Sequence, residues 1–134
     1  STRRETYRFT WLRSFHNPIA IRIEKLDNVY KLYWKLCSGD GGYAPGNLII
    51  HKQKIIDKMA WYAFIELLRQ IDYWKLNTFE EVSMGTDGAE WIIEGKRLNQ
   101  YHWVERWTPN HESKYFKCCN FLIVPGLREF SLGR

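Results

Sequence analysis

The stretch from Asp87 to Pro109 contains the residue types that acid/base catalysis requires. His102 lies close in sequence to the carboxylates of Asp87 and Glu90. A histidine beside a carboxylate titrates near neutral pH and can take up and return a proton during a reaction. One hypothesis for the chain is therefore a small hydrolase or lyase in which His102 works with Asp87 or Glu90.

The expected geometry of this stretch weakens that hypothesis. A two-residue turn at 98–99 makes it a hairpin of about residues 90–107, in which Trp91 lies opposite Arg106 and Gly95 opposite His102. Side chains on a strand alternate between the two faces, so His102 projects away from Glu90. An assembled site would then need Asp87, or Arg13 or His16 from the first strand.

No established catalytic, metal or phosphate-binding motif supports an enzyme. The chain lacks GxSxG and HExxH, and its glycine-rich segment at 39–46 lacks the Gly-Lys-Ser/Thr ending of a phosphate loop. The histidines are spaced too widely for a local zinc-binding pair; they are His16, His51, His102 and His111. We predict no metal and no cofactor, and the lack of these motifs argues against an enzyme without excluding one.

The three cysteines have the distribution of structural thiols. Cys118 and Cys119 are adjacent, and Cys37 is far away in sequence without a CxxC partner. Adjacent cysteines on a helix point in different directions, so we expect small buried thiols. A bridge between Cys37 and one of the other two remains an alternative.

The other face of the hairpin suggests recognition. Tyr101, Trp103 and Trp107 share it with charged residues. Large rings left in water mark a contact surface, whereas the same rings under the C-terminal helix would be core. Our leading hypothesis is a non-catalytic binding or interaction domain for an unknown protein or small molecule. Its candidate binding residues are Trp103, Trp107, Arg106, Tyr101, His102, Arg13 and His16.

Alternating apolar residues predict the strands that must position these groups. Tyr7 to Phe15, Ile19 to Ile23 and Tyr30 to Leu36 each alternate with period two, and an apolar run at 48–50 follows the glycine-rich segment. A turn at Asp27-Asn28 sets apolar side chains of the second and third strands opposite each other, and sets Glu24 opposite Lys31. The first half of the chain is therefore predicted to be four strands.

Two helices complete the expected fold. Asp57 can cap a helix over about 57–71 with one apolar stripe, and a second helix is expected over about 112–124, ended by Pro125-Gly126. The order ββββ-α-ββ-α predicts an α+β fold, a single curved and largely antiparallel sheet with both helices on one face. The 134 residues suit one domain over 1–134.

Composition restricts the partners only broadly. The net charge is +5, but the basic residues are scattered, which argues against a nucleic-acid stripe and leaves weak nucleic-acid binding as a lesser alternative. No apolar run reaches the roughly 18 residues of a spanning helix. The chain begins with Ser1, which is compatible with removal of a leader.

Three segments together resemble an uncharacterised family of small bacterial proteins. They are YRFTWLRSFHNPIAIRIE, GDGGYAPGNL and DGAEWIIEGKRLNQYHWVERWTP, and the family carries Asp-Gly where this chain has Leu98-Asn99. Members often follow a signal or lipoprotein leader. The resemblance implies a bacterial domain that is periplasmic or extracellular when such a leader precedes it. It implies no activity.

Overall fold

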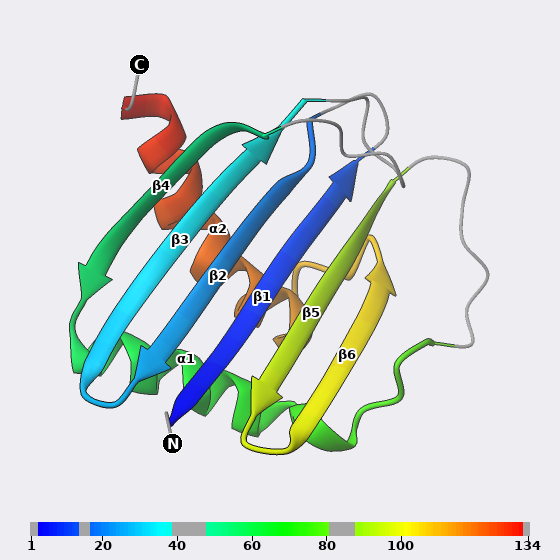
Figure 1. Cartoon of the computed structure of the whole chain (residues 1–134). Helices are drawn as coiled ribbons and strands as arrows, with labels where there is room; N and C mark the ends of the chain where they lie inside the picture. Colours follow the sequence, from blue (N-terminus) through cyan, green and yellow to red (C-terminus); the bar gives the residue numbers. More distant parts are fainter. Residues whose placement is uncertain (1–2, 14–16, 39–47, 81–87, 133–134) are drawn as a thin grey trace.

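The computed structural model describes residues 3–13, 17–38, 48–80 and 88–132, with the side chains at 48–49 and 126–132 left aside. Six strands form one antiparallel sheet in the order β4-β3-β2-β1-β5-β6 (Figure 1). The strands are β1 (Arg4–Arg13), β2 (Ile19–Leu26), β3 (Val29–Cys37), β4 (Leu48–Ile56), β5 (Ala89–Arg97) and β6 (Gln100–Trp107). The predicted α+β architecture is confirmed.

Both hairpin registers expected from the sequence are present. In β2 and β3, Ile23 lies opposite Leu32 and Glu24 opposite Lys31. In β5 and β6, Trp91 lies opposite Arg106. These pairings follow from short turns and from alternation, because a slip by one residue would move every apolar side chain to the other face.

Pairing between β1 and β5 joins the two parts of the sheet. Tyr7 lies opposite Gly95, and Arg8 lies opposite Glu94. The last hairpin therefore docks beside the first strand, and β4 and β6 become the edges of the sheet.

Both helices lie on the same side of the sheet, as predicted (Figure 1). The first, α1 (Lys58–Gln70), begins at Asp57, whose side chain accepts a hydrogen bond from the Ala60 amide at 2.8 Å. It is followed by the short 3₁₀ turn η1 (Tyr73–Lys75). The second helix is α2 (Lys114–Leu132). We call the opposite side, which no described helix covers, the open face.

Buried tyrosine hydroxyls connect the helical layer to the sheet. Tyr73 Oη lies 2.9 Å from Ile93 O and 2.8 Å from His102 O, and its single proton is donated to this pair of carbonyl oxygens. Tyr115 Oη lies 2.7 Å from Trp91 O and 3.1 Å from Val104 O. These contacts provide partners for polar groups that burial has removed from water.

The second helix is longer than predicted. It runs through Pro125 to Leu132, whereas the sequence pattern placed its end at Pro125-Gly126. A proline inside a helix removes one backbone hydrogen bond and tends to kink the helix, but the turns on either side can still form. The second part of β4, up to Ile56, also extends beyond the predicted apolar run at 48–50.

The cysteines are free thiols. Cys118 and Cys119 are fully buried on α2, and Cys37 is half-buried at the end of β3. Burial raises the pKa of Cys118 to about 12 and also raises the pKa of Cys119. The alternative of a Cys37 bridge is therefore wrong, and the thiols of α2 are protonated core groups.

Candidate binding surface

His102 is a structural residue on the helix-covered face of β6. Its Nε2 lies 2.7 Å from the carbonyl oxygen of Leu76, and its ring packs edge-on against Tyr73 at 5.4 Å. Since a carbonyl oxygen only accepts, Nε2 must carry the proton in this contact. That nitrogen is engaged in holding the chain after η1 rather than in accepting a proton from a substrate.

Arg106 also holds the segment that follows η1, at residues 77, 78 and 80. Its guanidinium donates to Asn77 O at 3.1 Å and to Thr78 O at 3.2 Å, and its Nε lies 3.8 Å from Glu80. Although Arg106 lies opposite Trp91, its guanidinium lies over the Tyr115 ring, 5.8 Å from the ring centroid, rather than over the Trp91 ring. The difference arises because the carbonyl groups of residues 77 and 78 draw the guanidinium toward the sheet edge.

Residues 76–80 cover the outer edge of β6. The backbone of Glu105 donates to Thr78 O at 2.8 Å, and the amide of Trp107 donates to Glu80 Oε1 at 3.2 Å. An uncovered strand edge invites pairing with another chain, and this segment occupies the edge at these positions. His102 and Arg106 therefore stabilise an edge cover.

The acid/base candidates are not brought together among the described residues. Glu90 lies on the open face opposite Trp107, whereas His102 lies on the helix-covered face opposite Gly95. Arg13 lies opposite Ala89, which is six residue steps, or about 20 Å of strand, from Gly95. Arg13 is therefore far from His102, which lies opposite Gly95. Asp87 and His16 lie outside the described residues.

Arg13 is occupied locally. Its guanidinium stacks on the Trp11 ring at 4.3 Å from the centroid and donates to Asn17 O at 3.4 Å. Burial lowers the pKa of Arg13. A hollow of about 370 Å³ lies beside Arg106 and Trp107, and His102 is not among its described lining residues.

The aromatic residues predicted for recognition lie on the open face. Trp103 and Trp107 are half-buried, and Tyr101 is 59% exposed. Phe79, from the edge cover, is also 59% exposed and meets the Trp103 ring edge-on at 5.4 Å. We call Phe79, Tyr101, Trp103 and Trp107 the aromatic surface. The C-terminal helix lies on the opposite side, so these rings are not beneath it.

A hydrogen-bonded network holds one end of the aromatic surface in place. Tyr101 Oη donates to Glu94 Oε2 at 2.6 Å, and Arg8 Nε donates to Glu94 Oε1 at 2.9 Å. Burial, followed by the hydrogen bond to Glu94, raises the pKa of Tyr101 to about 12. Tyr101 therefore stays neutral at physiological pH.

Two carboxylates lie among the rings. Glu105 is half-buried, and Glu90 is only 6% exposed. Burial is the main cause that raises the pKa of Glu105, and the negative charge of Glu90 adds to it. Two partly desolvated acids side by side attract positive charge.

The half of the open face formed by β2 and β3 has a different character. It carries Lys31 and Lys35 on β3, and Arg22 of β2 stacks on the Tyr33 ring at 4.1 Å from the centroid. The open face of β2 and β3 therefore carries several basic residues beside Glu24, whereas the aromatic surface lies at the other side of the sheet's open face, on β6 and the edge cover.

Phe79, Arg8 and Glu94 were not among the predicted site residues. Phe79 belongs to no strand, so it shows no periodicity. Arg8 and Glu94 are separated by most of the chain and meet only through the pairing of β1 with β5. Alternation along each strand could have placed both on the open face, but not side by side.

A scan against protein-family models finds no match to this chain, and a search of curated proteins finds none either. Among the described residues, no helix is both long and apolar enough to cross a membrane. Within the same residues, no three of the His, Cys, Asp and Glu side chains gather as a metal site would require.

Proposed function

We propose that this chain is a non-catalytic binding domain that holds a protein partner on its aromatic surface. The observation that supports this proposal is the position of both helices on the other side of the sheet, which leaves Trp103 and Trp107 half-exposed. Tryptophan and tyrosine are enriched among the few residues that supply most of the binding energy in protein interfaces. Tyr101 and Phe79 extend the same surface.

The surface is organised before any partner arrives. Glu94 joins Tyr101 to Arg8, and Trp103 packs against Phe79. Side chains already held in one arrangement lose less conformational entropy on binding, so more of the interaction energy contributes to affinity.

The charge around the rings favours a partner that presents lysine or arginine between apolar side chains. Glu105 lies between the two tryptophans on β6, and Glu90 lies opposite Trp107. A cation beside Glu105 would stabilise the carboxylate whose pKa is raised mainly by burial and further by the charge of Glu90. The faces of the indole rings also attract cations. The same carboxylates would repel a phosphate backbone, which disfavours nucleic acid at this surface.

A hydrolase or lyase has less support. That alternative needs His102 beside an acid, and Nε2 of His102 is instead engaged by Leu76 O. We therefore propose no reaction at this residue.

The proposal is tested by selecting displayed random peptides on the immobilised protein. We expect the selected peptides to combine lysine or arginine with apolar residues, and to bind W103S about 30-fold more weakly, as for a hot-spot residue. The matched control is Y62S, because Tyr62 is an exposed ring on α1. Peptides that bind W103S and the parent protein equally would contradict the proposal.

We also propose that the domain works at the bacterial cell envelope. This rests on the resemblance of the three segments alone. Immunodetection of the protein expressed from its complete gene, in separated periplasmic, membrane and cytoplasmic fractions, tests it. Recovery only with the cytoplasmic marker would exclude an envelope location.

A further inference from the structure

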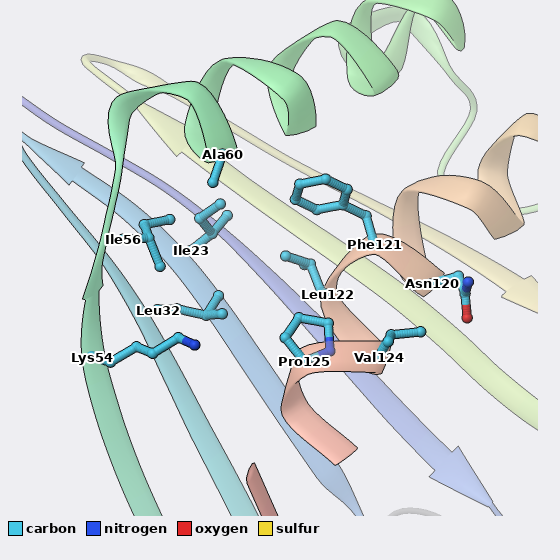
Figure 2. Close-up of a pocket in the computed structure, with 10 residues that line it drawn as sticks. All are labelled: Ile23, Leu32, Lys54, Ile56, Ala60, Asn120, Phe121, Leu122, Val124 and Pro125. Carbon is cyan, nitrogen blue, oxygen red and sulfur yellow. The ribbon is translucent and has the colours of Figure 1, made fainter. Parts of the chain in front are cut away.

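A groove lies on the helix-covered side, between β4 and the two helices (Figure 2). Its volume is about 490 Å³, within the range of small-molecule sites in proteins. Its walls are mainly apolar and include Ile56, Ala60, Phe121, Leu122 and Pro125. This groove is separated from the aromatic surface by the sheet itself.

Among the described residues that line the groove, Lys54 is the only charged one. It lies opposite Leu32 on β4, so its side chain leaves the strand on the helix side, and its amino group points toward α2 (Figure 2). Nζ of Lys54 lies 5.6 Å from the centre of the Trp34 ring. No carboxylate of the described residues forms an ion pair with it.

A buried donor lies next to this cation. Trp34 is 1% exposed, and its indole Nε1 has no hydrogen-bond partner among the described residues. Burying such a donor without an acceptor is unfavourable. An anion bound at Lys54 would bring an acceptor into the neighbourhood of this ring.

We propose that the groove binds one free fatty acid. The alkyl chain lies along the apolar walls, where burial of its surface drives binding, and the carboxylate pairs with Nζ of Lys54. A lysine ammonium is a compact point charge suited to a single anionic group. One groove with one cation matches one chain with one negative charge, and none of the described lining residues is acidic.

Lys54 also has a second role that the experiment must separate. A lysine facing inward on an edge strand hinders pairing with another sheet, and β4 is an edge. Loss of edge protection would increase aggregation of a variant. It would not change the affinity of the soluble monomer for a ligand.

The test is calorimetric titration of the monomeric protein with dodecanoate below its micelle concentration, with dodecyltrimethylammonium as the cationic counterpart. We expect one dodecanoate per chain and much weaker binding of the cation. K54Q should bind dodecanoate about fivefold more weakly, the upper range for an exposed ion pair, and K54E more weakly still. The matched control K35Q changes an exposed lysine of β3 and should bind as the parent does.

A second pair of variants tests the apolar part of the groove. A60F places a ring in the lining and should weaken dodecanoate binding at least tenfold, whereas A63F changes an exposed alanine of the same helix and should have no effect. Circular dichroism shows whether each variant is folded. If A60F does not fold, the Lys54 variants alone test the proposal. The proposal is overturned if dodecanoate shows no saturable binding, or if the two amphiphiles bind equally. It is also overturned if the protein binds anionic phospholipid vesicles in a sedimentation assay but does not bind free dodecanoate.

Discussion

Nε2 of His102 donates to the carbonyl oxygen of Leu76 across 2.7 Å, from the middle of β6 to the end of the η1 turn. This contact, and those of Arg106 with Asn77 and Thr78, hold the edge cover against the sheet. The histidine that looked reactive in the sequence is thereby part of the fold.

Replacing His102 by alanine should lower the free energy of unfolding by about 1–3 kcal/mol, because a half-buried carbonyl group loses its donor. Urea unfolding measures this change. H102Q retains a donor and should recover part of the loss. Both variants should still bind the peptides selected on the aromatic surface, and loss of that binding in folded H102Q would contradict a purely structural role.

Gly95 should not tolerate a side chain. A Cβ atom there would lie 2.9 Å from ring carbons of both Tyr7 and Tyr73, and the carbonyl groups of Ile93 and His102 hold the Tyr73 hydroxyl in place. G95A should therefore reduce the free energy of unfolding by about 2 kcal/mol, the typical effect of overpacking. Thermal unfolding measures this change. The control is K96A, because Lys96 is the exposed neighbour of Gly95, and this variant should change stability little.

Glu105 should make stability depend on pH. Because its pKa is raised in the folded protein, the folded state binds the proton more tightly than the unfolded state. The contribution of Glu105 to stability is complete below its unfolded pKa and is lost as pH rises through the folded value. E105Q should therefore stabilise the protein relative to the parent at pH 7 and not at pH 3, as measured by urea unfolding at both pH values.

The same substitution also tests the charge of the proposed partner. E105Q removes the acid that lies between the two tryptophans on β6, so the selected cationic peptides should bind it more weakly at pH 7. Unchanged peptide affinity would show that the rings act without the carboxylates.

Leu98 should be replaceable with a gain in stability. Its φ of 44° lies in the left-handed region, and its side chain is 82% exposed, so the turn strains the backbone without a packing contact in return. We expect L98G to raise the free energy of unfolding by about 0.5–1 kcal/mol, since glycine adopts this conformation freely. N28G serves as a comparison, because Asn28 has no positive φ. An equal gain in both variants would contradict the explanation.

Local patterns in the sequence determined the hairpins. The pairs Ile23–Leu32 and Trp91–Arg106 lie close along the chain, so a short turn and the alternation of side chains are sufficient to set their register. The same reasoning located α1, because its cap at Asp57 and its apolar stripe are both local signals. The α+β class followed from the order of these elements.

Tertiary structure alone decided which of these residues are available for binding. Trp103 and His102 are neighbours on β6, and only the choice of the face that the helices cover leaves Trp103 half-exposed and makes His102 a partner of Leu76. The pairing of Arg8 with Glu94 and the groove beside Lys54 likewise join segments far apart in the chain. Such contacts depend on how the helices pack against the sheet. That packing is determined by burial of apolar side chains from the whole chain, so no single stretch of sequence predicts it.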